Sequence, residues 1–201
     1  MSDLEGFILT GGASSRMGAD KSRLLLGGQT FIGRAAEALG RVAPQVSVVS
    51  ARASDAELGL PLVRDVFAGA GALGGLHAAL ESCRAPWAAV VSCDLPFVTA
   101  ELFARLASLR DTIFDAVAPR QEDGRAQPLC ALYARDHCLR AAERLLRAGE
   151  RRPRVLLAEA RTRWITPDEL ADLPSSARFF TNVNTPADYA LAVETERAGE
   201  Q

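Results

Sequence analysis

Residues 7–24 decide the fold, and they read Phe-Ile-Leu-Thr-Gly-Gly-Ala-Ser-Ser-Arg-Met-Gly-Ala-Asp-Lys-Ser-Arg-Leu. An apolar strand over residues 7–9 runs directly into a glycine-rich turn that carries Arg16 and Lys21. Glycine has no Cβ atom to keep a ligand away from the backbone, so several N–H groups converge on phosphate oxygens while the basic side chains supply positive charge. The stretch therefore indicates a loop that holds a nucleoside triphosphate, with an ordinary strand-to-helix loop as the alternative.

Two well-known phosphate loops do not match this stretch. A P-loop requires Gly, four further residues and then Gly-Lys-Ser/Thr, whereas the residue five positions after Gly12 is Met17. The dinucleotide fingerprint requires Gly-x-Gly-x-x-Gly, whereas the third position counted from Gly11 is Ala13. The loop is therefore neither that of an ordinary P-loop ATPase nor that of an ordinary dehydrogenase.

Apolar runs alternate with helical patterns along the rest of the chain. Strands are expected at about Gly6–Thr10, Val46–Ala51, Leu62–Asp65, Ala88–Asp94, Ala116–Pro119, Leu129–Ala134 and Phe179–Asn182. Helices are expected at about Phe31–Val42, Leu73–Ser82, Ala100–Leu109, Arg135–Ala148, Pro153–Ala160 and Pro186–Glu196. Thr99 is expected to cap the N-terminus of the third of these. Several strand segments are continuous apolar runs, as expected for strands that are covered on both faces. This predicts an α/β fold with three layers around a mainly parallel sheet, in a single domain of residues 1–201.

The composition narrows the class of protein. Lys and Arg number 23 and Asp and Glu 25, which gives a formal net charge of −2 at pH 7. Nucleic-acid-binding proteins usually have a basic surface, so we expect no nucleic acid among the partners. The N-terminus, Met-Ser-Asp-Leu-Glu, lacks the basic and then apolar pattern of a signal peptide. No stretch approaches the roughly 18 uninterrupted apolar residues of a membrane span, so we expect a cytoplasmic protein.

Acidic residues stand at the ends of two expected strands. Ligands of open α/β sheets bind beyond the carboxyl ends of the strands, so functional side chains should gather there. Asp65 and Asp94 both satisfy this condition. Because Mg²⁺ prefers a few carboxylates together with phosphate oxygens and water, Asp94 is a candidate ligand for it. The alternative is that Asp94 only caps the turn before Pro96.

The segment of residues 180–186, Phe-Thr-Asn-Val-Asn-Thr-Pro, places two amides at the end of the last expected strand. Alternate positions of a strand project to the same face, so Asn182 and Asn184 should point the same way. Amides offer donors and acceptors that suit a heterocycle or a phosphate. A second interpretation, compatible with the first, is that Asn184 or Thr185 caps the final helix.

The cysteines and histidines indicate neither a metal site nor a redox site. No Cys-x-x-Cys spacing is present among the four cysteines. His77 and His137 lie far apart in helical patterns, and we assign neither of them a direct chemical role.

The motif Leu-x-Gly-Gly-x-Ser-x-Arg-Met-Gly-x-Asp-Lys-x-x-Leu, over residues 9–24, resembles the signature of the molybdenum cofactor guanylyltransferases. These are nucleotidyltransferases with a Rossmann-like fold. The Asp-x-Pro element at Asp94 and the Asn-x-Asn-Thr-Pro element at Asn182 follow in the same order. The resemblance implies transfer of GMP from GTP to the phosphate of molybdenum-bound molybdopterin, with release of pyrophosphate.

The resemblance also implies a role for each matched residue. The catalytic residues would be Arg16, Lys21 and Asp94, with Asp94 as the Mg²⁺ ligand. The nucleotide would be bound by Leu9, Thr10, Gly11, Gly12, Lys21, Asp65 and Asp94. The acceptor would be bound by Asn182 and Asn184. Catalysis of this kind depends on positioning and electrostatics, so no protein nucleophile is required.

The chain departs from the family pattern at two points that bear on these roles. Thr10 stands where relatives usually have alanine. Relatives that use cytidine commonly read Ala-Ala-Gly where this chain reads Thr-Gly-Gly, which disfavours cytidine as the base. Gly71–Gly75 reads Gly-Ala-Leu-Gly-Gly where relatives usually read Gly-Pro-Leu-Ala-Gly; we interpret it as the second wall of the nucleotide pocket, with a flexible helix-entry loop as the alternative. Three alternative functions stay open: a cytidylyltransferase on the same pterin, a sugar-phosphate nucleotidyltransferase and a non-catalytic nucleotide-binding protein. Docking to other cofactor-assembly proteins is compatible with the chemistry.

Lys21→Ala and Asp94→Asn should each abolish most turnover and leave the fold intact. Each change removes one charge that positions or neutralises phosphate, and the loss of one such group typically lowers kcat by roughly 10²–10³-fold. Pyrophosphate release measures the rate, and circular dichroism checks the fold. An unchanged rate in either variant would remove that residue from the mechanism.

Overall fold

The computed structural model describes residues 3–10, 23–52, 59–65, 67 and 69–199. The strands in this part of the chain are β1 (Leu4–Leu9), β2 (Leu25–Leu26), β3 (Gln29–Thr30), β4 (Val46–Ser50), β5 (Leu62–Arg64), β6 (Trp87–Ser92), β7 (Ala116–Pro119), β8 (Cys130–Ala134) and β9 (Thr162–Ile165). The α-helices are α1 (Phe31–Gly40), α2 (Gly71–Ser82), α3 (Ala100–Ser108), α4 (Arg135–Arg147), α5 (Pro153–Glu159) and α6 (Pro186–Gly199). Two 3₁₀ turns, Pro167–Leu170 and Ser176–Arg178, precede α6.

The described strands form one large, mainly parallel sheet and one small hairpin. The large sheet has seven strands in the order β5-β4-β1-β6-β8-β7-β9, and β2 pairs with β3 separately. β1 is parallel to its two neighbours, β4 and β6, and the β4–β5 and β7–β9 pairs are also parallel. Among these strands only β8 runs in the opposite direction, antiparallel to β6 and β7. The mainly parallel sheet predicted from the sequence is confirmed.

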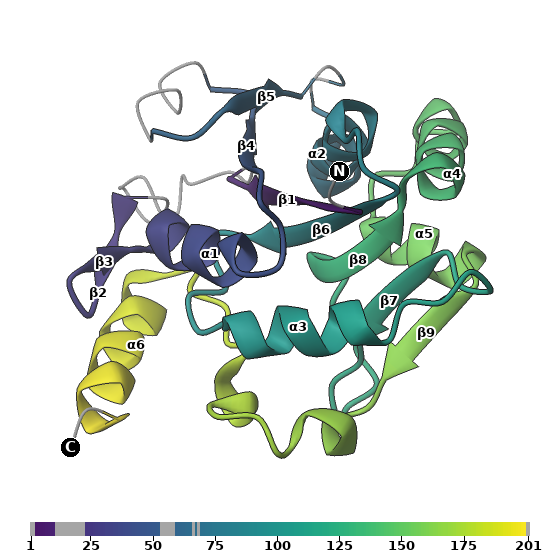
Figure 1. The fold of residues 1–201 in the computed structure, drawn as a ribbon. Coiled ribbons are helices and arrows are strands. Elements are labelled where there is room, and N and C mark those ends of the chain that lie inside the picture. The colour runs from purple at the N-terminus through teal and green to yellow at the C-terminus, as the bar shows by residue number, and fades with distance from the viewer. Residues whose placement is uncertain (1–2, 11–22, 53–58, 66, 68, 200–201) are drawn as a thin grey trace.

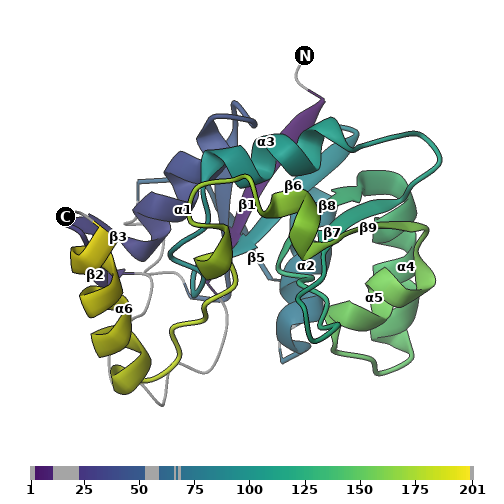
Figure 2. The ribbon, with the colours of Figure 1, turned by 90° about the horizontal axis from the view of Figure 1, so that it is seen from below.

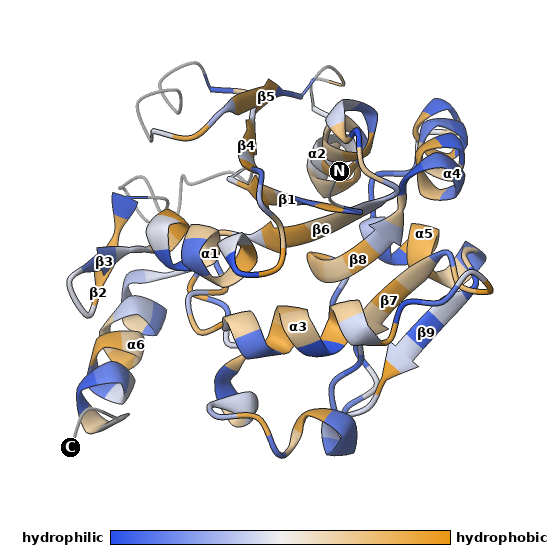
Figure 3. Cartoon of the chain, viewed as in Figure 1, coloured by the Kyte–Doolittle hydropathy of each residue, from blue (hydrophilic) through white to orange (hydrophobic). Residues whose placement is uncertain are grey.

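Helices cover both faces of the sheet, with α1 and α3 on one side and α2, α4 and α5 on the other (Figures 1 and 2). β1 contributes to both cores because successive side chains of a strand point to opposite faces. Ile8 packs in the core that contains Ile32 of α1, whereas Phe7 and Leu9 pack in the core that contains Leu73 of α2. The central strands are accordingly hydrophobic along most of their length, as Figure 3 shows for β6 and β8. The predicted three-layer α/β fold is confirmed.

Threonine side chains cap the N-termini of three of the described helices, α1, α3 and α6. Thr30 accepts a hydrogen bond from the N–H of Gly33 at 3.1 Å. The predicted cap at Thr99 is confirmed, since its hydroxyl accepts from the N–H of Leu102 at 3.4 Å. Thr185 accepts from the N–H of Asp188 at 3.2 Å. Each threonine satisfies one N–H that the helix leaves without a partner. No described helix has the length and apolar character needed to cross a bilayer.

The predicted strand over Phe179–Asn182 is wrong. This segment continues from the 3₁₀ turn Ser176–Arg178, and the N–H of Thr181 donates to the carbonyl of Arg178 at 3.0 Å. Phe179 is fully buried in the core between the sheet and the helices α1 and α3. The aromatic residues that suggested a strand therefore fill the core from a turn, because tertiary packing overrides β-propensity.

The edge strand β9 was not predicted, because its sequence, Thr-Arg-Trp-Ile, contains few apolar residues. It pairs in parallel with β7. Asp115, immediately before β7, anchors the start of β9 by binding Arg161, the residue before that strand. The buried carboxylate accepts from the backbone N–H of Arg161 at 3.0 Å and from Nε and Nη2 of the same residue at 2.9 and 2.8 Å. These bonds from Arg161 hold the pKa of Asp115 below its usual value.

Asp115→Asn should lower the free energy of unfolding by roughly 1–3 kcal/mol at pH 7, because a charged hydrogen-bond network is weakened. The depressed pKa of Asp115 in the folded state means that its contribution is complete above the unfolded value of about 4. The contribution is lost as the pH falls through the folded-state pKa, so the difference between wild type and variant should shrink below about pH 4. Urea unfolding of both proteins across roughly pH 3–7, the range in which carboxyls titrate, measures this difference in the free energy of unfolding.

Asp123→Asn is the matched control, since Asp123 lies on an exposed turn and pairs with Arg125 at 2.7 Å. An exposed pair of this kind contributes about 0–1 kcal/mol. Equal pH dependence of wild type and the Asp115→Asn variant would contradict the anchoring role of Asp115.

Candidate active site

The direction of the chain along the sheet reverses between β1 and β6. From β1 the chain proceeds outward to β4 and β5, and after β6 it proceeds to the other side of the sheet. Open α/β sheets bind ligands outside the carboxyl ends of the strands at such a switch point. The N–H of Cys93 donates to the carbonyl of Leu9 at 3.0 Å, so Asp94 follows directly beside the end of β1. Thr10, the last described residue before the glycine-rich sequence, and Asp94 therefore lie at the same edge of the sheet.

Four of the predicted site residues, Gly11, Gly12, Arg16 and Lys21, lie outside the described residues, so their roles stay predictions. Leu9 and Thr10 lead into their loop. Leu9 is buried against α2, and both the N–H and the hydroxyl of Thr10 contact the carbonyl of Val49, at 3.1 and 3.3 Å. Both side chains are thus used by the fold: Leu9 packs in a core, and the Thr10 hydroxyl bonds to the carbonyl of Val49.

The turn after β6 presents a single carboxylate. All residues from Ser92 to Val98 are buried except Asp94. The N–H of Leu95 donates to the carbonyl of Ser92 at 3.2 Å, which closes the turn. In the described part of the chain the Asp94 carboxylate has no hydrogen-bond or ion-pair partner. Buried neighbours thus fix a half-buried acid at the switch point.

The donor set around Asp94 suits a metal that shares its coordination with a substrate. The described residues contain no group of three or more His, Cys, Asp or Glu side chains that could hold a metal ion by themselves. Mg²⁺ usually binds through one or two carboxylates together with phosphate oxygens and water. A lone carboxylate at the edge of the sheet where Thr10 leads into the predicted phosphate-binding sequence fits this requirement.

Asp65 stands at the end of β5 and is approached closely by α2. One carboxylate oxygen accepts from the N–H of Phe67 at 3.0 Å. A Cβ atom at Gly74 would lie 3.2 and 3.3 Å from the two oxygens of Asp65 and 2.9 Å from the Cβ atom of Ala70. Burial raises the pKa of the Asp65 carboxyl, an effect partly offset by the Phe67 N–H and by nearby His77. Glycine at position 74 is therefore favoured, because an added methyl group would crowd both Ala70 and the Asp65 carboxylate.

The idea that Gly71–Gly75 forms a flexible loop at the helix entry is wrong, because these residues already belong to α2. His77, to which the sequence analysis assigns no direct chemical role, lies one turn after Gly74 and is buried in this region. It is 4% exposed, and its ring contacts that of Phe67 at a centroid distance of 4.8 Å. His77 follows Gly74 by three residues, and this spacing places both on the same face of α2.

Asn182 and Asn184 lie beside Asp94 although they are not on a strand. Both are exposed and flank the fully buried Val183, whose N–H donates to the carbonyl of Asp94 at 2.9 Å. The segment of Asn182 and Asn184 therefore lies at the strand ends near Asp94, as predicted, but it does so as irregular backbone and not as the end of a strand. The predicted cap of the final helix by Thr185 is confirmed, since its hydroxyl accepts from the N–H of Asp188.

A mainly parallel sheet with an acid at its switch point, in a chain whose first strand leads into a glycine-rich sequence, is typical of Rossmann-like nucleotidyltransferases. Residues 6–164 match the model of the MobA-like NTP transferase domain. The chain therefore belongs to the MobA-like NTP transferase family, and it is a nucleotidyltransferase.

Relatives cover nearly the whole chain. A protein of Pelotomaculum thermopropionicum, named "Probable molybdenum cofactor guanylyltransferase", is 37% identical over 198 residues, which are 96% of this chain and 95% of that protein. A protein of Chloroflexus aggregans with the same name is 36% identical over 196 residues, 94% of this chain and 92% of that protein. The crystal structure of molybdopterin-guanine dinucleotide biosynthesis protein A from Archaeoglobus fulgidus has a TM-score of 0.81 at 26% identity and covers 98% of this chain and 100% of that one.

Gly74→Ala should weaken GTP binding by roughly tenfold, about 1.4 kcal/mol, because the new methyl group displaces the Asp65 carboxylate. Isothermal calorimetry measures the Kd. Gly40→Ala is the control, since Gly40 is also helical and has no atom within 4 Å of its added Cβ. That variant should keep the Kd and gain up to about 1 kcal/mol of stability. Equal affinities of the Gly74→Ala variant and wild type would exclude Asp65 from the nucleotide site.

Proposed function

We propose that this protein transfers GMP from GTP to the terminal phosphate of molybdenum-bound molybdopterin and releases pyrophosphate. The observation that carries the proposal is the position of Asp94, the one residue of a buried turn that is not itself buried, beside the end of β1. Membership of the MobA-like NTP transferase family and the names of the relatives support the same reaction.

The proposed reaction is an in-line displacement at the α-phosphorus of GTP. An oxygen of the acceptor phosphate forms a bond to this phosphorus, and the bond to the pyrophosphate oxygen breaks. The backbone of Gly11 and Gly12 would position the triphosphate, and Arg16 and Lys21 would offset the charge that develops on it. Asp65 would bind the nucleoside side of the site, and the exposed amides of Asn182 and Asn184 would bind the acceptor.

Asp94 would be the protein ligand of Mg²⁺, which, when bound, offsets the negative charge of the phosphate oxygens. The carboxylate has no competing cation among the described side chains, so its charge stays available. The turn of buried residues around it keeps the carboxylate in place before any ligand arrives. Such preorganisation lowers the cost of orientation during the reaction.

GTP and molybdenum-bound molybdopterin are the partners that we propose, and the cytoplasm is the location. A requirement for other cofactor-assembly proteins would follow from the lability of the pterin acceptor. Neither a nucleic acid nor a membrane is needed for the proposed reaction.

Pyrophosphate release tests the function, with molybdenum-loaded molybdopterin, Mg²⁺ and either GTP or CTP. We expect release with GTP, and a kcat/KM for CTP at least about 100-fold lower, because a site that hydrogen-bonds one base leaves its polar groups unpaired with another. Omission of the acceptor or addition of EDTA should stop release. Turnover with CTP alone would reassign the protein as a cytidylyltransferase, and release with neither nucleotide would overturn the proposed reaction.

A further inference from the structure

Arg34 of α1 connects three segments that are far apart in the sequence. Its Nε donates to the carbonyl of Pro96 at 2.8 Å, and its Nη1 donates to the carbonyl of Leu26 at 3.2 Å. Nη1 also pairs with the Glu196 carboxylate of α6 at 2.6 Å. The side chains of this pair are only 22% and 18% exposed, so the contacts are largely shielded from water. One guanidinium thus joins the hairpin, the turn of Asp94 and the last helix.

The same three segments share a small apolar core. Its buried members are Leu26, Phe31, Phe97, Val183 and Ala192. α6 lies beside the β2–β3 hairpin, away from the two main helical layers (Figures 1 and 2), and the hydroxyl of Tyr189 donates to the carbonyl of Leu25 at 2.7 Å. The Arg34–Glu196 pair is therefore part of a packed interface between these segments.

Gly27 has no side chain, and the Arg34–Glu196 ion pair occupies the space that a Cβ atom would take there. Its φ is +57°, and an added Cβ atom would lie 2.9 Å from Oε1 of Glu196 and 3.4 Å from Nη1 of Arg34. The two glycines of the β2–β3 turn have the positive φ angles that a two-residue hairpin favours. The hairpin is thus shaped so that the carboxylate of α6 reaches Arg34.

We propose that Arg34 is a positioning residue for Asp94, an inference that rests on the proposed role of Asp94 in the reaction. Pro96 stands two residues after Asp94, and its carbonyl is held by Arg34. The carbonyl of Asp94 itself is held by the N–H of Val183. The turn is therefore held at two of its backbone carbonyls, once from α1 and once from the segment before α6.

The geometry requires a guanidinium. Arginine donates from several nitrogens in one rigid plane, which serves two carbonyls and one carboxylate at once, whereas lysine offers a compact ammonium group on a flexible stem. Arg34→Lys keeps the charge and the aliphatic stem but loses the directed bond to Pro96. Residues that orient a ligating carboxylate typically change metal affinity or activity about 10–100-fold when they are replaced.

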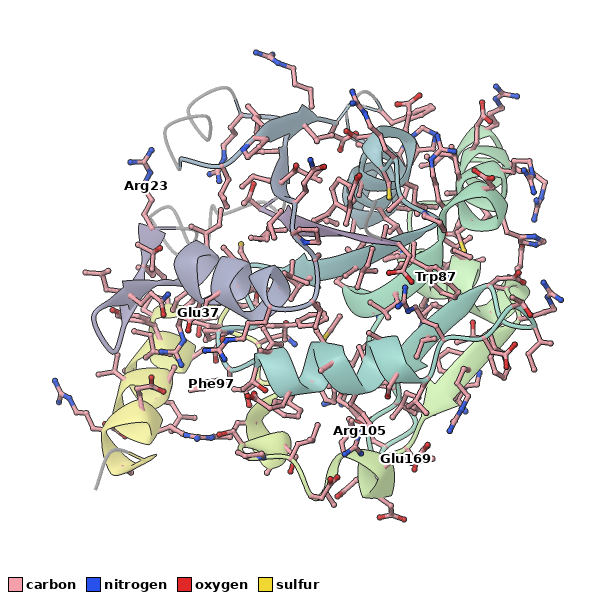
Figure 4. All side chains as sticks on the ribbon, in the orientation of Figure 1. Arg23, Glu37, Trp87, Phe97, Arg105 and Glu169 are labelled. Carbon is pink, nitrogen blue, oxygen red and sulfur yellow. The ribbon has the colours of Figure 1, made fainter. Side chains whose placement is uncertain are left out.

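The first test uses the metal-free protein and measures amide hydrogen exchange. In the Arg34→Lys variant the N–H of Val183 should exchange at least about tenfold faster, because the turn that holds its acceptor loosens. Arg105→Lys is the matched control: Arg105 joins α3 to Asp172 at 2.6 Å and to the carbonyl of Glu169, below α3 and apart from α6 in the view of Figure 4. This control should leave the exchange of Val183 unchanged.

The second test measures GTP binding by calorimetry with and without Mg²⁺. Arg34→Lys should weaken the Mg²⁺-dependent part of binding by about 10–100-fold and leave metal-free binding unchanged. Glu196→Gln keeps both carbonyl bonds of Arg34 and should change either readout by no more than about twofold. A loss in the Glu196→Gln variant as large as in the Arg34→Lys variant would mean that only the ion pair matters, and would overturn the positioning role.

The two tests separate this inference from the proposed function. Wild-type protein that binds no GTP with Mg²⁺ would overturn the proposed function, while the exchange of Val183 would still decide whether Arg34 holds the turn. Exchange and Mg²⁺–GTP binding that are the same in Arg34→Lys as in wild type would overturn the role of Arg34. A melting temperature near that of wild type confirms that each variant is folded.

Discussion

The parallel pairing of β1 with β6 is the constraint on which the site depends. The hydrogen bond from the N–H of Cys93 to the carbonyl of Leu9 continues this pairing beyond the end of β6. This bond brings two residues to the same edge of the sheet: Thr10, which follows β1 and leads into the glycine-rich sequence, and Asp94, which stands two residues after β6. Because both strands are buried on both faces, their polar successors have access to ligand only at this edge.

Burial around the site serves to orient its few polar groups. The turn of Asp94 is buried at every other position, and Asp65 is confined between the backbone of Phe67 and the helix that Gly74 allows to approach. Burial raises the pKa of Asp65, so the fold pays a cost in solvation to keep this carboxyl where it is. Groups that are held in place before binding lose little entropy when a ligand arrives.

The last helix has a role beyond completing the fold. α6 packs on the hairpin and on Phe97, and Glu196 and the segment before the helix both reach the supports of the Asp94 turn. The two main cores hold the sheet and its helices, whereas this third core holds the pieces that surround the switch point. The described contacts of α6 with the Asp94 turn are therefore indirect, through Phe97 and Arg34.

Local patterns in the sequence were sufficient to predict the alternation of strands and helices, the caps at Thr99 and Thr185 and the acids at the strand ends, because periodicity and capping depend on neighbours in the chain. Tertiary structure alone decided that Phe179 fills the core from a turn and that the polar segment Thr162–Ile165 forms an edge strand. It also decided that Val183 and Arg34 hold the turn of Asp94. These features depend on contacts between residues far apart in the sequence, whose partners are chosen by packing and not by local propensity.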